Sequence, residues 1–451
     1  MTGESSHNVH IVSLGCPKNF VDTEVMAASL LTRQFGITPD PAEADVFLIN
    51  TCAFLPSARE EAEEFISEAV QWKKESPGRR IIVTGCLNQW DSERTYAAKY
   101  PEVDLWVGIN QTPELGPLLE RLFRDQDAAS TYEPCRYLYD DATPRLQLTP
   151  PHYAYLKITE GCDNCCAYCS IPRIRGPLRS RSIASVVREA RNLLDAGVRE
   201  LILIGQDITA FGHDGNGGSL AELLRQLDRL DGDFMLRLLY AHPAHVTDEL
   251  IATIAAAKHV LPYLDLPLQH ISDRILASMG RYVTRRDTET LLDKLTATIP
   301  DLALRTTFIT GYPGETEAEF QELRDFVAAR QFRRLGVFAY CAEPQTRAAM
   351  LPAPVPAAIA AARRDEIMAL QAKMSLKFNQ TLVGKNLRVI IDEKTGKTTA
   401  TGRTYMDAPE IDNLVDIRNL HRIRPGATIE VKITACSNYD LEGKPAIKKQ
   451  L

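Results

Sequence analysis

Hydrophobic positions in the first part of the chain alternate between short β-branched runs and longer stretches with a helical period. The runs at 10–14, 46–50 and 80–84 predict buried strands, and each is followed by a pattern with the 3.6-residue period of a helix. A further run at 104–109 predicts one more strand. Strands that alternate with helices form parallel sheets. We therefore predict an N-terminal parallel-sheet α/β domain over 1–125.

A stretch rich in Asp, Pro and Thr follows at 126–147 and has the composition of a linker. Beyond it, six apolar runs alternate with helical patterns over 148–382. Six consecutive βα units predict a partial barrel, which resembles a TIM barrel without its eight-unit closure. The predicted strands are 154–159, 200–205, 235–240, 263–268, 304–310 and 335–341.

The last part of the chain, 383–451, changes to short alternating strands separated by Gly and Asp turns. This pattern is typical of a small all-β domain, and we predict a five-stranded barrel. The predicted fold class is thus α/β, with a parallel-sheet domain, a central partial barrel of six βα units and a C-terminal β-barrel.

The cysteines are the feature of the composition that bears on function. The chain has 451 residues, of which 45% are hydrophobic and 25% charged, as in ordinary globular proteins. No apolar run reaches the roughly 18 residues of a membrane span, and the start MTGESSHNVH lacks the apolar segment of a signal peptide. We therefore expect a cytoplasmic protein without a membrane partner. In a reducing compartment, ten cysteines indicate metal or redox chemistry rather than disulfides.

Three cysteines stand at the spacing CxxxCxxC after the first strand of the predicted partial barrel: Cys162, Cys166 and Cys169. Three thiolates can hold three irons of a cubane cluster while the fourth iron stays open for catalysis. A zinc site is one alternative, although four-cysteine zinc sites separate their pairs by about a dozen residues. Buried cysteines that pack as small apolar groups are the other. We favour the iron-sulfur cluster, with Cys165 as a spare thiol.

Cys16, Cys52 and Cys86 are distant in sequence but share one structural position. Each follows shortly after a predicted parallel strand of the first domain. The carboxyl ends of parallel strands lie at one edge of a sheet, where α/β folds build their sites. We therefore expect these three thiols to converge and to hold a second cluster with one open iron.

Glycines and polar residues also follow strands of the partial barrel, and they are candidates for cofactor binding. Glycine permits close backbone approach to a ligand, and polar side chains can bind an ammonium or a ribose, although each position is equally consistent with a simple turn. The run at 173–181 carries four arginines, which suit either a substrate carboxylate or a solvated basic face. The candidates after the second, fourth and fifth strands are Gly205, Gln206, Asp207, Pro267, Gln269, His270, Gly311, Pro313 and Gly314.

These motifs resemble those of the methylthiotransferases, a family of radical S-adenosylmethionine (SAM) enzymes. The resemblance rests on SLGCPKNFVDTE, INTCAFLPSARE, VTGCLNQ and EGCDNCCAYCSIPRIRGPLRSR. Within the family, the chain is most similar to the RimO type, on YLDLPLQHISDRILASMGR, LRTTFITGYPGETE and GRTYMDAPEIDN. One departure is Gln345, because the resemblance leads us to expect a glycine before Thr346.

The resemblance implies an enzyme that inserts a methylthio group at the β-carbon of an aspartate of ribosomal protein uS12. It implies two [4Fe–4S] clusters and two uses of SAM, as methyl donor and as radical source, with Tyr168 at the cofactor site. A radical is chemically required, since no acid or base removes hydrogen from a saturated carbon at neutral pH.

Charge bears on the choice of partner. The net charge of −7 argues against general electrostatic binding of nucleic acid. The C-terminal domain resembles the TRAM module, which binds RNA in tRNA-modifying relatives, but it holds only 12 Lys and Arg against 9 Asp and Glu. Its segment 406–417 predicts an acidic surface suited to a basic ribosomal protein, or a loop that is acidic for solubility alone. The carboxylates of this segment are Asp407, Glu410, Asp412 and Asp416.

Three functions remain open from the sequence. The favoured one is a monomeric protein methylthiotransferase, with uS12 as substrate and an electron donor protein as second partner. A tRNA adenosine 2-methylthiotransferase is less favoured, and a two-cluster electron carrier or zinc-stabilised binding module is the third. Cys135, Cys341 and Cys436 have no spacing partner, and we expect them to be packing residues.

Overall fold

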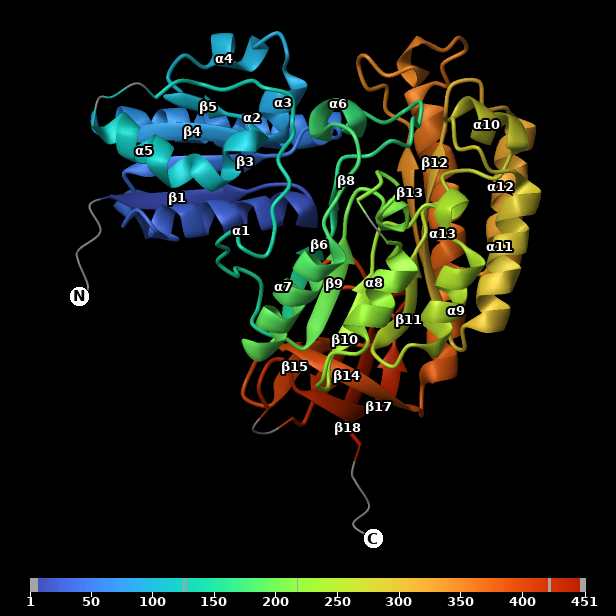
Figure 1. The fold of residues 1–451 in the computed structure, drawn as a ribbon. Helices are drawn as coiled ribbons and strands as arrows, with labels where there is room; N and C mark the ends of the chain where they lie inside the picture. Colours follow the sequence, from blue (N-terminus) through green and yellow to red (C-terminus); the bar gives the residue numbers. More distant parts are fainter. Residues whose placement is uncertain (1–6, 125, 127, 217, 421–422, 447–451) are drawn as a thin grey trace.

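The structure of the chain is a computed structural model that describes residues 7–124, 126, 128–216, 218–420 and 423–446. It contains two larger parallel sheets and a closed barrel, in the order predicted along the chain (Figure 1). The predicted fold class is therefore confirmed. No helix in the described part of the chain has the length and apolar character needed to cross a membrane.

The first sheet has the order β2-β1-β3-β4-β5, with every neighbouring pair parallel and helices on both faces (Figure 1). Alternate residues of its central strand face opposite layers, so that Phe47 packs on the side of Ile66 and Leu48 on the side of Met26. The two-residue edge strand β2 was not predicted, because so short a run carries no periodicity. The elements are β1 (Asn8–Ser13), α1 (Pro17–Leu31), β2 (Gly36–Ile37), β3 (Val46–Thr51), α2 (Pro56–Lys74), β4 (Arg80–Gly85), α3 (Cys86–Trp90), α4 (Thr95–Lys99), β5 (Leu105–Val107) and α5 (Leu115–Phe123).

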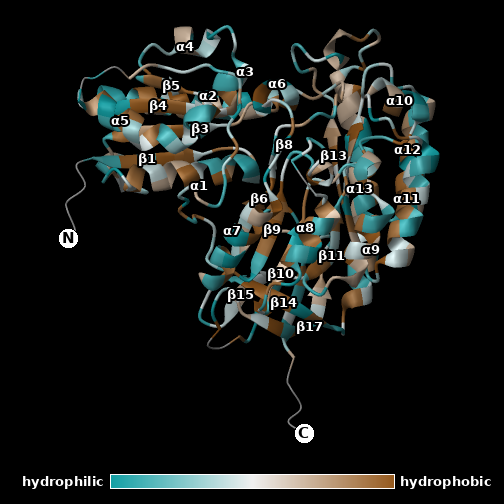
Figure 2. Ribbon diagram, viewed as in Figure 1, coloured by the Kyte–Doolittle hydropathy of each residue, from teal (hydrophilic) through white to brown (hydrophobic). Residues whose placement is uncertain are grey.

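The second sheet has six parallel strands in the order β13-β12-β11-β10-β9-β6, and its edges, β6 and β13, are not paired with each other in the described chain. This is the predicted partial barrel. Its strands are hydrophobic, whereas its covering helices α11 and α12 show hydrophilic surfaces (Figure 2). The strands are β6 (Tyr153–Lys157), β9 (Glu200–Ile204), β10 (Met235–Leu238), β11 (Val260–Asp265), β12 (Ala303–Thr310) and β13 (Arg334–Ala339), with a small pair of β7 (Thr159–Glu160) and β8 (Arg179–Ser180). The helices are α6 (Ile171–Arg175), α7 (Ile183–Asp195), α8 (Leu220–Leu227), α9 (Asp248–Ala256), α10 (Asp273–Ser278), α11 (Arg285–Thr298), α12 (Glu317–Arg330) and α13 (Ala357–Leu382).

The C-terminal domain is a closed five-stranded barrel of order β14-β15-β16-β18-β17, as predicted. It lies below the amino ends of the central strands (Figure 1). Its strands are β14 (Asn386–Glu393), β15 (Thr399–Arg403), β16 (Val415–Arg418), β17 (Thr428–Cys436) and β18 (Leu441–Pro445).

The acidic segment of this domain does not form the free surface predicted from the sequence. It bridges the two unpaired edges of the partial barrel, because it contacts both β6 and β13. The carboxylates therefore serve to dock the C-terminal barrel, and only Asp416 remains as an exposed acid without such a contact in the described chain. The contacts are Asp407 with Arg334 (2.8 Å), Glu410 with the Tyr153 hydroxyl (2.9 Å) and Asp412 with the Tyr263 hydroxyl (2.7 Å).

A buried ionic cluster joins the same two domains. Glu200 at the start of β9 is 0% exposed and accepts hydrogen bonds from Arg237 at 2.6 Å and from Arg403 of the C-terminal barrel at 2.8 Å. The variant Glu200→Gln leaves the buried guanidinium of Arg237 without its anion and leaves Arg403 with Asp392 alone, so we expect it to lower the free energy of unfolding by about 3–5 kcal/mol. Urea unfolding followed by circular dichroism measures this loss.

The exposed pair Arg388–Asp233 provides the control, since Arg388→Ala should cost less than about 1 kcal/mol. Equal losses in the two variants would contradict the prediction. Burial tends to raise the pKa of Glu200, but Arg403 and Arg237 overcome it and lower the pKa from 4.5 to about 2. The stabilisation is therefore complete above pH 4.5 and is lost as the pH falls toward 2. The difference between wild type and Glu200→Gln should shrink over the same interval.

Candidate active site

One cavity of about 510 Å³ lies between the first domain and the carboxyl ends of the central strands. All six cysteines of the two predicted triads line it. The C-terminal domain also reaches it, through Ile411 of the docking segment. Residues from all three domains thus form one chamber, and each triad opens on it.

The register of the first sheet brings Cys16, Cys52 and Cys86 together. Ser13 at the end of β1 lies opposite Asn50, and Thr51 at the end of β3 lies opposite Gly85, so the three strands end at one level. Each cysteine follows its strand within three residues. The predicted convergence at the sheet edge is therefore seen in the structure.

Two glycines are required for this approach. Gly15 has φ +89°, and a Cβ on it would lie 2.5 Å from the Cβ of Cys52. Gly85 has φ +95°, and its Cβ would lie 2.5 Å from the Thr51 carbonyl oxygen. Real Cβ atoms do not come so close, and a left-handed φ disfavours other residues. The glycines before Cys16 and Cys86 thus allow the thiol-bearing turns to meet.

The electrostatics of this triad favour negative charge at one member. Burial raises the pKa of the Cys52 thiol and raises that of Cys86 to about 12. Burial also opposes ionisation of Cys16, but Lys18, Arg175 and two backbone N–H groups outweigh it, so that the pKa of Cys16 is lowered. Full ionisation of the triad therefore needs a metal centre that displaces the protons of Cys52 and Cys86.

The CxxxCxxC loop is anchored on the other side of the chamber. Within the motif, the Ala167 N–H donates to the Met279 carbonyl at 2.8 Å, and the Ala167 carbonyl accepts from the Ala348 N–H at 2.8 Å. Burial raises the pKa of Cys162 to about 11 and that of Cys169 to about 12. The spare thiol, Cys165, is exposed. The three motif cysteines line the chamber, and Cys165 is not among the lining residues.

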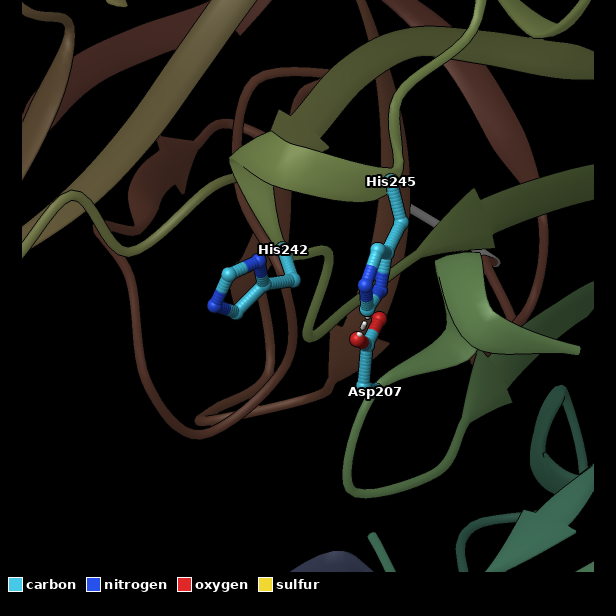
Figure 3. A group of neighbouring side chains, drawn as sticks. All are labelled: Asp207, His242 and His245. Atoms are coloured by element: carbon cyan, nitrogen blue, oxygen red, sulfur yellow. Dashed lines mark hydrogen bonds and ion pairs between the residues drawn. The ribbon is translucent and has the colours of Figure 1, made fainter. Parts of the chain in front are cut away.

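Neither triad has the geometry of a site for a single ion. Among the residues that the structure describes, the one group of three metal-ligating side chains with all ligand atoms within 4.8 Å of one another is Asp207, His242 and His245 (Figure 3). Thiolates about 2.3 Å from a single zinc ion would meet this spacing. A cubane binds each thiolate through a different iron, so its ligands lie farther apart. The spacing therefore disfavours the zinc alternative.

Two members of this group, Asp207 and His245, interact directly with each other. Nδ1 of His245 lies 2.8 Å from Oδ2 of Asp207, and the same oxygen accepts from Asn164 Nδ2 at 2.6 Å. His242 Nδ1 accepts from the Ala244 N–H, and its ring points away from the other two residues (Figure 3). Since Asp207 Oδ2 is engaged by both His245 and Asn164, we interpret these residues as a network that holds Asn164, inside the CxxxCxxC loop, in place.

Arg175 connects the second triad to a buried ionic network. Its Nη2 donates to Cys86 Sγ at 3.2 Å, and its Nη1 donates to Asp22 at 2.7 Å and Glu160 at 3.2 Å. Lys157 donates to the same two carboxylates, at 2.5 and 2.9 Å. All of these side chains are buried. The network ties α1 to the central domain and places a cation on the second triad.

Most of the remaining arginine run is also engaged with the protein. Arg181 binds Glu189 at 2.5 Å, and Arg173 donates to the Trp90 carbonyl at 2.9 Å. The role in substrate binding that the sequence left open for this run is therefore not supported for its buried members, Arg175 and Arg181.

The predicted cofactor residues fall into two groups. Tyr168, Gln206, Asp207, Pro267 and Gln269 line the chamber. The others, Gly205, His270, Gly311, Pro313 and Gly314, are not among its lining residues.

Three members of the second group, Gly205, His270 and Gly311, are closely packed against neighbouring segments. A Cβ on Gly311 would lie 2.2 Å from the Cβ of Ala360 in α13, and a Cβ on Gly205 would lie 2.1 Å from Thr159 Oγ1. His270 is fully buried beside Glu315, with His270 Nε2 and Glu315 Oε1 3.4 Å apart. These residues shape the strand ends that support the chamber.

Several buried polar atoms on the chamber wall have no hydrogen-bond partner among the residues that the structure describes. They are Gln206 Oε1, Gln269 Oε1, His242 Nε2 and Arg281 Nε. Buried polar groups are normally hydrogen-bonded, so a cluster of unpaired ones indicates a polar ligand. The wall therefore fits a cofactor with amino, carboxylate and ribose groups. SAM has all three, so the residues present are suited to bind it.

Sequence reasoning missed Lys18, Tyr240 and Arg281, which also line the chamber. Tyr240 follows β10 as Gln206 follows β9, so the rule of strand ends could have found it. Gln345 has φ 66°, in the left-handed region where the resemblance predicted a glycine. The backbone conformation expected there is therefore kept despite the side chain.

Three families match the three parts of the chain. The Uncharacterized protein family UPF0004 matches residues 8–108, the Radical SAM superfamily matches 156–327, and the TRAM domain matches 383–445. The first and third matches span the first sheet and the C-terminal barrel, and the second covers most of the six-stranded sheet but ends before β13.

Curated relatives match almost the whole chain. The ribosomal protein uS12 methylthiotransferase RimO of Syntrophotalea carbinolica is 43% identical over 97% of this chain and 96% of its own length. Its counterpart in Syntrophus aciditrophicus is 45% identical over 96% of this chain and 97% of its own. The counterpart in Geobacter sulfurreducens is 42% identical over 98% of this chain and 99% of its own length. The chain belongs to the RimO family.

Solved structures support the fold of this RimO-family chain. The radical SAM methyltransferase TsrM from Kitasatospora setae, with tryptophan and a SAM analogue bound, has a TM-score of 0.56 at 16% identity, over 90% of this chain and 80% of its own. The cobalamin-dependent radical SAM enzyme OxsB has a TM-score of 0.51 at 13% identity, over 80% of this chain and 56% of its own. Identities this low show the fold alone.

Proposed function

We propose that this chain inserts a methylthio group at the β-carbon of an aspartate of ribosomal protein uS12. The observation that carries the proposal is the shared chamber, in which both cysteine triads face one space. A substrate carbon in that space lies within reach of both centres, and such positioning is what the protein must contribute to cofactor chemistry. Relatives at 42–45% identity carry the name of this activity.

The cofactors in this proposal are two [4Fe–4S] clusters and SAM. Cys162, Cys166 and Cys169 would hold one cluster, and Cys16, Cys52 and Cys86 the other. When bound, these groups supply the one-electron chemistry and the methylthio group that no side chain can supply, with SAM used once as methyl donor and once as radical source.

The chain's own residues prepare this chemistry. Arg281 lies beside the first triad, with its Nη1 3.9 Å from Cys166 Sγ, and Arg175 lies beside the second. These cations offset the negative charge of thiolates in a buried site. The unpaired side-chain oxygens of Gln206 and Gln269 would be available to accept hydrogen bonds from the ammonium of SAM. Tyr168, packed with Ala167 in a small apolar cluster, fixes the position of the motif loop.

The mouth of the chamber suits a protein substrate better than a nucleic acid. Phe54, Leu55 and Ile411 line the chamber and are 39%, 37% and 42% exposed. Exposed apolar side chains at a site favour contact with a protein surface, whereas a phosphate backbone needs cations. We further propose that the chain acts as a monomer in the cytoplasm and takes its reducing electron from a donor protein.

The test is anaerobic reconstitution with iron, sulfide, SAM and a chemical reductant, followed by incubation with a uS12 peptide. Mass spectrometry should show the target aspartate with one hydrogen replaced by SCH₃. A methylthio group on adenosine of added tRNA, with an unchanged peptide, would replace the proposal by the tRNA alternative. Cleavage of SAM without either product would contradict both.

A further inference from the structure

Lys18 places a buried cation on the chamber wall without an anion. The side chain is only 9% exposed and lines the chamber two residues after Cys16. In the described chain its Nζ has no hydrogen bond and no ion pair with a carboxylate. Nζ lies 3.3 Å from the ring centroid of Tyr240, and its charge acts on Cys16, the pKa of which it helps to lower.

The other buried cations show how unusual this is. Lys157, Arg175, Arg181 and Arg403 are each bound to a buried or half-buried carboxylate at 2.5 to 2.8 Å. Burial of a charge without a counter-ion is costly. Of the two other cations on the chamber wall, Arg175 binds carboxylates and Arg281 contacts Cys166 Sγ instead. An unpaired ammonium at a ligand chamber therefore indicates a ligand that brings the missing negative charge.

Tyr240 holds the ammonium in place. Its backbone has φ 68°, a conformation that bulky residues rarely adopt, and its N–H donates to Asp265 at 3.0 Å while its carbonyl accepts from the Ile208 N–H at 3.0 Å. A cation–π contact engages one side of an ammonium and leaves its other N–H donors available. Those donors are the feature that a carboxylate would bind.

The position of Lys18 separates it from the other cations of the chamber. Arg281 contacts Cys166 and donates to the Pro267 carbonyl at 2.5 Å, so it belongs to the first triad. Arg175 already donates to Cys86 and to two carboxylates. Lys18 lies on the Cys16 side and has no carboxylate partner in the described chain. It is therefore the cation that is available to a substrate carboxylate near the second triad.

We propose that Lys18 binds the carboxylate of the substrate aspartate and so selects an acidic side chain. This inference rests on the proposed function, because it assigns a residue to the substrate of that reaction. The ion pair would fix the carboxylate and thereby place the neighbouring β-carbon in the chamber. Lys18 acts by binding, and no proton or electron moves through it.

The decisive experiment compares wild type with Lys18→Met and Lys18→Arg on two peptides, one with the target Asp and one with Asn in its place. Loss of a buried ion pair with substrate should lower kcat/KM for the Asp peptide by about 100-fold in Lys18→Met. For the Asn peptide, the same variant should have the kcat/KM of wild type, so that the preference for Asp over Asn disappears. Lys18→Arg should keep part of this preference, since it keeps the charge.

Lys74→Met is the matched control, because it makes the same change on the exposed face of α2 in the same domain. Iron content, the electron paramagnetic resonance spectrum of the cluster held by Cys162, Cys166 and Cys169, and SAM cleavage without peptide should stay unchanged in Lys18→Met, because Lys18 lies on the Cys16 side of the chamber. Loss of the iron bound by the second triad would instead assign Lys18 to the second cluster and overturn the inference. An unchanged Asp preference would also overturn it. If wild type modifies neither peptide, the proposed function itself fails.

Discussion

Replacing Cys166 by alanine should abolish SAM cleavage and reduce the iron bound after reconstitution to about half that of wild type. Cys166 is the central cysteine of the CxxxCxxC motif and lines the chamber. Two thiols cannot hold the cluster as three do, and without it no electron reaches the cofactor. Product from the uS12 peptide should fall to the background seen without enzyme. Iron analysis and chromatography of the SAM cleavage product measure both effects.

The adjacent Cys165 provides a closely matched control. It is exposed and does not line the chamber, so Cys165→Ala should keep wild-type iron, SAM cleavage and product. Equal losses in Cys165→Ala and Cys166→Ala would show that the motif had been assigned wrongly. Normal SAM cleavage by Cys166→Ala would remove the basis for a radical enzyme.

Much of the site could be predicted because it follows from topology. Cys16, Cys52 and Cys86 have no sequence spacing in common, but parallel strands end at one edge, and the register of β1, β3 and β4 then brings the thiols together. The succession of strands and helices along the chain was equally accessible, since it follows from the periodicity and length of the apolar runs, although the two-residue strand β2 was missed. What made the prediction work was a rule about strand ends, which does not depend on the details of packing.

Predictions that depended on side-chain partners fared less well. Asp407 and Asp412 look like surface acids in the sequence, but Arg334 of the edge strand β13 and Tyr263 of the inner strand β11 bind them. Charge patterns in sequence do not reveal whether a distant cation is brought into contact. Lys18 was overlooked for the converse reason, because a lysine becomes informative only when its partners are seen to be missing.

The role of a glycine is also hard to predict from the sequence alone. Gly311 follows a strand and suits a ligand turn, but its missing Cβ makes room for Ala360 of α13. Gly15, which the sequence analysis did not single out, is the glycine that lets the first turn approach Cys52. A glycine in sequence indicates a close approach, whereas only the structure shows which group approaches it.

Replacing Cys86 by alanine should separate the two halves of the reaction. The variant keeps the CxxxCxxC triad, so SAM cleavage should continue within about threefold of wild type, while the methylthio peptide should be absent and bound iron again about half. This pattern is expected because Cys86 belongs to the triad of the first sheet, on the opposite side of the chamber from Cys166. Loss of SAM cleavage together with product would instead mean that the first site depends on the second.

Cys135→Ala is the suitable control for this variant, since Cys135 is a buried cysteine that lies outside both triads and contacts Arg179 Nη2 at 3.6 Å. It should lose a little stability through packing and keep both activities. Arg175 adds a second reason for the effect of Cys86→Ala, because its guanidinium donates to Cys86 Sγ and would be left with only oxygen acceptors. Full methylthio product from Cys86→Ala would show that Cys16, Cys52 and Cys86 do not form a functional unit, however closely the sheet register aligns them.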